Sequence, residues 1–157
     1  MSRRIKNTED RVLKVRIKLL SENATAPSYG TEFSAGADLY NLKGEDVVIP
    51  SGKTVMIHTG ISLEIPEGYA GLIFARSGLA TKRGLAPANK VGVIDSDYRG
   101  EIMVSLHNHS DNDECVAGGE RVAQLVIVPF LKSEFEIAEE LSDTVRGAGG
   151  FGSTGKL

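Results

Sequence analysis

The chain has 157 residues, of which 41% are apolar, and its formal net charge is −3 at pH 7. This length favours one domain with a buried core, and the near balance of charge gives no basic footprint for nucleic acid. No apolar run approaches the length of a membrane span, so neither nucleic acid nor a membrane is an expected partner.

The first residues and the cysteine content both point to a protein that is not exported. Residues 1–11 are charged and lack the apolar segment of a signal peptide, which predicts a flexible, solvated leader. Cys115 is the single cysteine and cannot form an internal disulfide, which suits a reducing compartment. The expected location is therefore the cytoplasm.

The apolar pattern predicts strands along most of the chain. Residues 12–20 alternate apolar and basic side chains, which predicts a half-buried strand, and residues 24–34 are predicted as a loop. Further strand candidates, separated by turns, lie at 47–49, 54–65 with an interruption at Gly60, 69–75, 91–94, 102–108, 121–130 and 134–138. The best helix candidate is short, at residues 77–82. This spacing is typical of an all-β sandwich or barrel.

Residues 92–101 combine turn-forming and reactive side chains. Two apolar residues lead into an Asp-Ser-Asp turn, and a second apolar run follows Gly100, which predicts a hairpin. Asp95 lies where the first strand ends, a rigid position facing a loop, where a general base is useful. Tyr98 can form a wall of the same cavity. Aspartate, serine and glycine are also common turn residues, so this segment alone leaves both interpretations open.

The C-terminal residues differ in composition from the rest of the chain. Residues 147–156 contain five glycines and one aromatic side chain, too little apolar surface to order themselves. Residues 150–156 match part of a phosphate-binding P-loop, but no helix can follow because the chain stops at Leu157. An ordinary P-loop is therefore excluded, whereas wrapping of an anion by glycine amides and hydroxyls remains available.

Five segments in fixed order carry a resemblance to a known family. They are AGADLY at 35–40, ARSGLA at 75–80, GVIDSDYRGE at 92–101, GERVAQL at 119–125 and RGAGGFGSTG at 146–155. In order and spacing they resemble the five motifs of the trimeric deoxyuridine triphosphate nucleotidohydrolases, the dUTPases, from about residue 14 to the C-terminus.

The resemblance implies a fold and a domain organisation. It implies an all-β, dUTPase-like barrel or jelly-roll-like sandwich spanning residues 12–142. Residues 143–157 would then form a flexible glycine-rich arm, a lid exchanged between subunits. The implied assembly is a homotrimer whose three active sites are shared between subunits.

The resemblance also implies a reaction and its substrate contacts. Water would attack the α-phosphorus of dUTP with Asp95 as the base, giving dUMP and pyrophosphate, limiting uracil in DNA and supplying dUMP for thymidylate synthesis. Tyr98 would lie under the deoxyribose, and Phe151 would stack on the uracil. The uracil edge would be read by Asn89, Val93, Ile94 and Met103. The phosphates and the rest of the substrate would be held by Arg76, Ser77, Gly78, Gln124, Arg146, Gly152, Ser153 and Thr154.

Magnesium is the implied cofactor. Mg²⁺ keeps several waters and binds mainly through substrate phosphates, and by resemblance Asp38 would touch it only through water. The sequence shows no carboxylate cluster with direct ligand spacing, and His107 and His109 lack a partner set, which indicates surface or packing roles.

Two other functions fit the same fold. A deoxycytidine triphosphate deaminase, or a bifunctional deaminase–diphosphatase, would attack C4 of cytosine, but its relatives have a different, serine-rich second motif and lack the Gly-Phe-Gly-Ser-Thr arm. A nucleotide-responsive regulatory or scaffold protein would be expected to have lost Asp95 or the arm, and this sequence has both.

Overall fold

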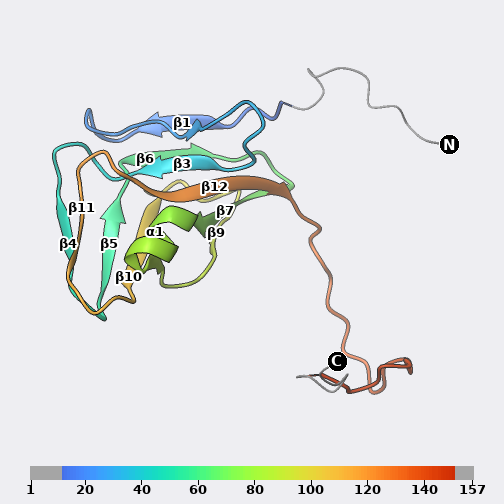
Figure 1. Ribbon diagram of the computed structural model, residues 1–157. Helices are drawn as coiled ribbons and strands as arrows, with labels where there is room; N and C mark the ends of the chain where they lie inside the picture. Colours follow the sequence, from blue (N-terminus) through green and yellow to red (C-terminus); the bar gives the residue numbers. More distant parts are fainter. Residues whose placement is uncertain (1–11, 151–157) are drawn as a thin grey trace.

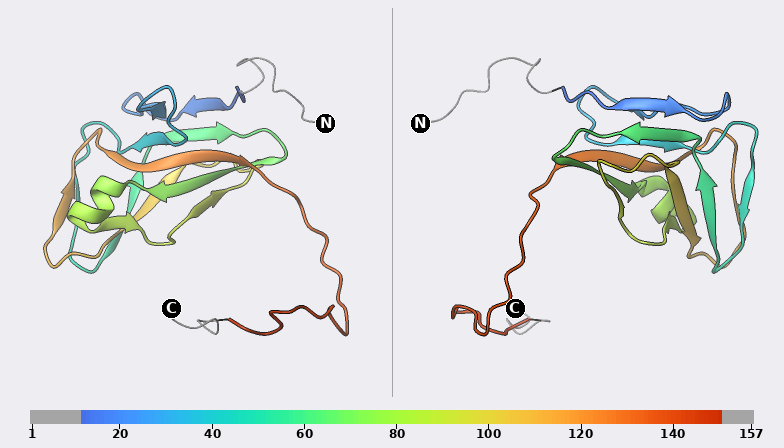
Figure 2. Two further views of the ribbon diagram at one scale, coloured as in Figure 1. Left: turned by 45° about the vertical axis from the view of Figure 1, so that its right-hand side comes forward. Right: turned by 180° about the vertical axis from the view of Figure 1, so that it is seen from behind.

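The computed structural model describes residues 12–150 and consists of β-strands and one short helix (Figures 1 and 2). Its largest sheet has five strands. Their order across the sheet is β2 (Ser28–Tyr29), β3 (Ala37–Tyr40), β12 (Arg121–Pro129), β7 (Tyr69–Ala75) and β9 (Gly92–Ile94). Every pair in it is antiparallel. The expected all-β class is therefore confirmed.

Three smaller antiparallel sheets complete the body. One pairs β1 (Arg16–Leu19) with β6 (Ile61–Glu64), and one pairs β11 (Glu114–Val116) with β4 (Val47–Ile49). The third has the order β5 (Thr54–His58), β10 (Met103–Asn108) and β8 (Leu85–Pro87). The strand pairing of residues 12–150 thus divides among separate sheets and does not run continuously around one barrel.

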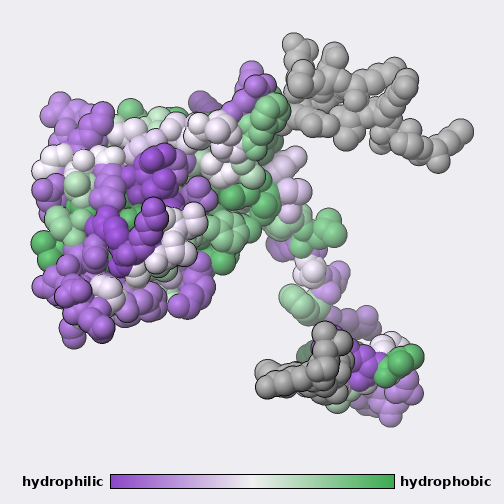
Figure 3. Space-filling view, viewed as in Figure 1, coloured by the Kyte–Doolittle hydropathy of each residue, from purple (hydrophilic) through white to green (hydrophobic). Residues whose placement is uncertain are grey.

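The apolar side chains of these sheets meet in one core. Its fully buried members include Leu39, Ile57, Ile61 and Leu106, which come from three of the sheets, and Ile102, which directly precedes β10. The outer surface is largely hydrophilic in Figure 3, and apolar side chains gather where the C-terminal segment leaves the body. Residues 12–150 contain no helix whose length and apolar character would let it span a bilayer.

Several predicted elements are present with small changes. β7 has the predicted bounds, and the predicted helix is α1 (Ser77–Arg83). The long strand predicted at 54–65 is divided at Gly60 into β5 and β6, because Gly60 has a left-handed φ of 68° that a strand cannot accommodate. β2, β3, β8 and β11 were not predicted as strands; they are two to four residues long, too short for a clear period-two pattern.

Three predictions about strands were wrong. β1 is exposed along its whole length within one chain, because it pairs only with β6 and lies outside the core. The strands β9 and β10 do not form a hairpin: β9 pairs with β7, and β10 pairs with β5 and β8. Residues 134–138 form no strand, because the chain leaves the body after β12 and finds no strand partner within the described residues (Figure 1).

Gly60 and Gly52 provide a matched test of packing at a left-handed residue. Their φ angles are nearly equal, at 68° and 67°. A Cβ on Gly60 would lie 2.6 Å from Leu42 Cδ2 and 2.9 Å from Ala24 Cβ, whereas a Cβ on Gly52 would meet nothing within 4 Å. Gly60→Ala is expected to lower the free energy of unfolding by about 1–3 kcal/mol more than Gly52→Ala, the usual cost of overpacking. Urea denaturation of both variants measures the difference, and equal losses would contradict it.

Candidate active site

A pocket of about 270 Å³ lies where β9 and β10 separate into different sheets. The predicted residues that line it are Asn89, Val93, Ile94, Asp95, Tyr98 and Met103. The remaining lining residues had no role assigned from the sequence; they are Met56, Ile73, Pro87, Gly92, Glu101, Val104 and Ser105. The structure therefore brings together the proposed general base, Asp95, the tyrosine proposed to contact the deoxyribose, and the strands proposed to bind the uracil.

The separation of the two strands gives the pocket its backbone groups. β9 is an edge strand of the five-stranded sheet, so one side of its backbone has no strand partner. β10 pairs with β8 only from Leu106 to Asn108, and Met103 pairs only with His58 on the opposite side. Backbone N–H and C=O groups on both walls can therefore bind a ligand edge.

The loop between these strands is held by its own hydrogen bonds. The Tyr98 backbone N–H donates to Asp95 O at 3.2 Å, and the Tyr98 hydroxyl donates to Glu101 O at 3.1 Å. The Arg99 guanidinium donates to Ser96 O at 2.6 Å. Gly100 lies under the Tyr98 ring, and a Cβ there would collide with the ring and its hydroxyl. Glycine at this position thus allows the ring to fold across the loop.

Glu101, which also lines the pocket, supports the same loop through its carboxylate. One carboxylate oxygen accepts the Gly60 N–H at 2.8 Å, and the other lies 2.9 Å from His58 Nδ1. Glu101 therefore fastens the end of the loop to the turn between β5 and β6. Glu101 belongs to the third motif segment but had no role assigned from the sequence, because contacts across 41 residues cannot be read from a local pattern.

A second cluster forms around the buried carboxylate of Asp38, on β3. Its Oδ1 accepts from Arg76 Nε at 2.9 Å, and its Oδ2 accepts from Arg121 Nη1 at 3.2 Å. Arg76 also donates to the Arg121 carbonyl oxygen at 3.3 Å. The carboxylate thus holds two guanidinium groups together, the kind of group that binds phosphate. Arg121 was missed as a functional candidate, although it lies within the fourth motif segment.

The other predicted phosphate-binding residues lie around this cluster. Arg76 is the N-cap residue of α1, and Ser77 and Gly78 follow it as exposed residues of the first turn. Gln124 on β12 is the strand partner of Asp38 on β3. Within residues 12–150 the Gln124 side chain forms no hydrogen bond that meets standard geometry, so its amide is available to a ligand.

The two clusters of one chain lie far apart along β7. β9 is antiparallel to β7 with Ile94 opposite Gly71, so Asp95 lies near the start of β7. Arg76 follows the last residue of β7. Six residues of strand separate these positions, which at the usual rise of a strand is about 20 Å. That distance exceeds the length of a triphosphate group.

The remaining predictions concern metal ligands, histidines and the arm. Residues 12–150 contain no group of three or more side chains that could bind a metal directly. His107 Nδ1 lies 2.9 Å from Thr54 Oγ1, and the His107 ring contacts the ring of His109, which is exposed. Arg146 donates to Gly149 O at 2.8 Å. Phe151, Gly152, Ser153 and Thr154 lie outside the described residues, as does the leader at 1–11.

The sequence of this chain matches those of known dUTPases over most of its length. The dUTPase family model matches residues 22–155. The deoxyuridine 5′-triphosphate nucleotidohydrolase of Nautilia profundicola is 51% identical over 144 residues, which cover 92% of this chain and 100% of that protein. The enzyme of the same name from Hydrogenobaculum sp. is 50% identical over 91% of this chain and 99% of its own.

Solved structures similar to this chain are also dUTPases. A mutant dUTPase of Staphylococcus bacteriophage 80alpha with dUpNHpp superposes with a TM-score of 0.84 at 31% identity, covering 92% of this chain and 100% of the phage protein. A mutant dUTPase of S. aureus phage phi11, whose structure concerns the coordination of a structural Mg(II) ion, has a TM-score of 0.76 at 27% identity over 83% of this chain and 100% of its own. From its motifs, its fold and these relatives, the chain belongs to the dUTPase family.

Proposed function

We propose that this protein is a magnesium-dependent dUTP diphosphatase, which hydrolyses dUTP to dUMP and pyrophosphate. The observation that carries the proposal is the position of Asp95 on the wall of a pocket formed by two strands with unpaired backbone edges. A pocket of this kind binds a planar base, and the carboxylate beside it can activate water. The nucleotidohydrolase relatives support the same substrate.

The proposed reaction needs one base. Asp95 accepts a proton from a water molecule as the water oxygen forms its bond to the α-phosphorus. The bond from the α-phosphorus to the oxygen that bridges to the β-phosphorus breaks, and pyrophosphate leaves. Asp95 is exposed at the mouth of the pocket and forms no ion pair within residues 12–150, so its oxygens are accessible to water.

Backbone hydrogen-bonding groups would select the nucleobase, and steric exclusion would select the sugar. Uracil presents an acceptor, a donor and an acceptor along one edge, which the backbone groups of Val93, Ile94 and Met103 can match, with the Asn89 side chain beside them. A mismatched base leaves a buried polar group unpaired, which costs about 1–3 kcal/mol. The Tyr98 ring, fixed over Gly100, would leave no room for a ribose 2′-hydroxyl.

The distance between the two clusters supports an active site shared between subunits. Asp95 lies near one end of β7 and Arg76 at the other, and Asp38 holds the Arg76 guanidinium at its own end of the strand. A site that needs both residues therefore requires a second copy of the chain, which supports the proposed homotrimer. In this arrangement the base pocket of one subunit faces Arg76, Ser77, Gly78 and Gln124 of another.

The C-terminal segment supports the same assembly. After β12, the large apolar residues Leu131, Phe135, Ile137 and Leu141 are all at least 88% exposed in the single chain. These side chains are free to pack on another molecule. Residues 12–142 would form the catalytic domain, and residues 143–157 the arm. Arg146, Phe151, Gly152, Ser153 and Thr154 would close over the bound nucleotide of a neighbouring subunit.

Asp38 fits an indirect role at magnesium. A carboxylate has about four acceptor sites, and the two arginines use one on each oxygen of Asp38. The remaining sites can accept hydrogen bonds from waters around Mg²⁺ held by the substrate phosphates. When bound, magnesium would neutralise part of the triphosphate charge. In a cytoplasmic setting, the reaction would limit uracil incorporation into DNA and supply dUMP for thymidylate synthesis.

A substrate panel tests this function. Pyrophosphate release is measured with dUTP, dTTP, dCTP and UTP, each with Mg²⁺ and with excess chelator. We expect kcat/KM for dUTP to exceed that for dCTP by at least about tenfold, since one unpaired buried group costs about 1.4 kcal/mol or more. We expect dTTP and UTP to be poor substrates because the pocket would lack space for the thymine methyl group and the ribose 2′-hydroxyl, and we expect chelator to suppress turnover of dUTP. Ammonia release from dCTP would instead identify a deaminase, and no turnover of any nucleotide would favour a regulatory protein.

A further inference from the structure

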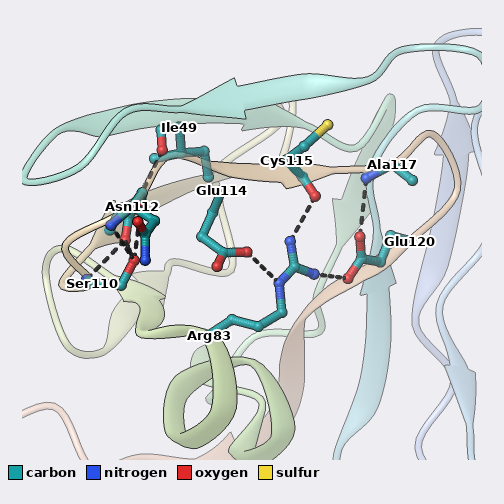
Figure 4. A network of polar contacts seen from close by, with 9 residues as sticks. Ile49, Arg83, Ser110, Asn112, Glu114, Cys115, Ala117 and Glu120 are labelled. Carbon is teal, nitrogen blue, oxygen red and sulfur yellow. Dashed lines mark hydrogen bonds and ion pairs between the residues drawn. The ribbon is translucent and has the colours of Figure 1, made fainter.

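Arg83, the last residue of α1, binds three groups on one neighbouring segment (Figure 4). Its Nε donates to Glu114 Oε2, its Nη1 to Glu120 Oε1 and its Nη2 to the carbonyl oxygen of Cys115, each at 2.6 Å. All the acceptors lie on β11 or on the turn that leads into β12. One side chain therefore attaches the end of the helix to this turn.

The acceptor Glu120 is itself held firmly. Its second carboxylate oxygen accepts the Ala117 N–H at 3.0 Å, and its carbonyl oxygen accepts the Asn41 N–H at 2.9 Å. Glu120 also directly precedes Arg121, which contacts both Asp38 and Arg76. The Arg83 contact thus reaches a part of the backbone that belongs to the phosphate-binding cluster.

The residue after the helix rests on a second polar network. Gly84 has a left-handed φ of 67°, its carbonyl accepts the His109 N–H at 2.9 Å, and a Cβ on it would lie 3.0 Å from Ser110 N. Ser110 donates from both its backbone N–H and its hydroxyl to Asn108 Oδ1, and buried Asn108 donates to Ile49 O at 2.9 Å. This end of the helix therefore has a fixed support.

Without these attachments α1 has little to hold it in place. It has seven residues, and only Leu79 among them is buried. Isolated helices this short are unstable in water, so their position depends on tertiary contacts. At the other end, Arg76 is turned back onto Asp38 and the Arg121 carbonyl. Ser77 and Gly78 lie between two arginine attachments, both of which lead to the start of β12.

We propose that Arg83 is a positioning residue, which holds α1 against the turn between β11 and β12 so that Arg76, Ser77 and Gly78 face the outer phosphates of the substrate. The inference rests on the proposed function, because it assigns a task to the phosphate-binding cluster. Arg83 itself does not touch the substrate. It acts through the helix, whose first turn carries the groups that do.

An arginine suits this task better than a lysine. Burial lowers the pKa of Arg83, but its contacts with Glu114 and Glu120 outweigh this effect and raise the pKa overall, so the guanidinium stays charged. Its planar fork can donate to three acceptors at fixed angles, whereas a lysine ammonium is a single point charge on a flexible stem.

The test separates binding of the outer phosphates from binding of the rest of the nucleotide. Inhibition constants are measured for a non-hydrolysable dUTP analogue with an imido bridge and for dUMP, which lacks the two outer phosphates. In Arg83→Ala we expect the constant for the analogue to rise roughly tenfold, the scale of a lost charged hydrogen bond, and the constant for dUMP to change less than about twofold. Arg83→Lys should restore part of the loss.

The control is Lys53→Ala, which removes a cation from an exposed residue whose hydrogen bonds within residues 12–150 are all made by its backbone. It should leave both constants unchanged. If Arg83→Ala does not fold, Glu114→Gln weakens one contact and should raise the analogue constant selectively, by about two- to threefold. Equal changes in the two inhibition constants, or no change in either, would overturn the positioning role of Arg83. Turnover of dUTP by the wild-type protein would still support the proposed function in that case. Absence of wild-type turnover would refute the function itself.

Discussion

Asp95→Asn is expected to bind dUTP with nearly unchanged affinity and to lose turnover by about 10²–10⁴-fold, the usual contribution of a general base. An asparagine has nearly the same shape, so the pocket between β9 and β10 keeps its form. The amide cannot accept the proton of the attacking water at neutral pH. Single-turnover rates of pyrophosphate release and calorimetric binding of dUTP to the variant measure the two effects separately.

Asp97→Asn is the matched control for this variant. Asp97 belongs to the same turn and is exposed. It lines a groove that Asp95 also borders, but unlike Asp95 it does not line the pocket between β9 and β10. Removing its charge should leave kcat within about threefold, as expected for a surface carboxylate whose interactions are screened. If Asp97→Asn were as slow as Asp95→Asn, the loss would reflect local charge and not the base. Unchanged turnover in Asp95→Asn would remove Asp95 from its role.

The sequence predicted best the elements whose signals are local. The bounds of β7 and the short helix follow from apolar periodicity and from flanking turn residues, and Gly60 correctly indicated an interruption. The pairing of β9 and β10 was predicted incorrectly, because a turn between two apolar runs has the same sequence whether the strands pair or separate. Strand partners depend on contacts that are distant in sequence, which a local pattern does not contain.

In the candidate site too, the residues within local motifs were predicted, whereas roles that depend on contacts distant in sequence were not. The pocket residues Asp95 and Tyr98 were proposed from a local motif, and the structure places both on its wall. The roles of Glu101 and Arg121 depend on partners at Gly60 and Asp38, which are 41 and 83 residues away. The exposed strand β1 was predicted to be half-buried for a related reason: alternation shows that one face is apolar, but not which molecule covers it.

Mixing two inactive variants is expected to restore activity if the active site is shared. Arg76→Ala removes the guanidinium that Asp38 orients, and Asp95→Asn removes the base. Each variant alone should be nearly inactive. In the proposed homotrimer, assembled at random from equal amounts of the two variants, each site takes Asp95 from one subunit and Arg76 from another. Roughly one site in four then combines both intact residues, so about a quarter of wild-type activity should return.

Co-expression of the two chains, with their ratio checked by mass spectrometry, provides the mixed trimers. The matched control co-expresses Asp95→Asn with the double variant Asp95→Asn/Arg76→Ala, in which no subunit can supply the base, and it should stay inactive. No recovery in the first mixture would show that Asp95 and Arg76 act within one chain. That result would conflict with the length of β7, because six residues of strand place the backbones of the two residues about 20 Å apart. Recovery would instead show that the fold cannot complete one active site without a neighbouring subunit.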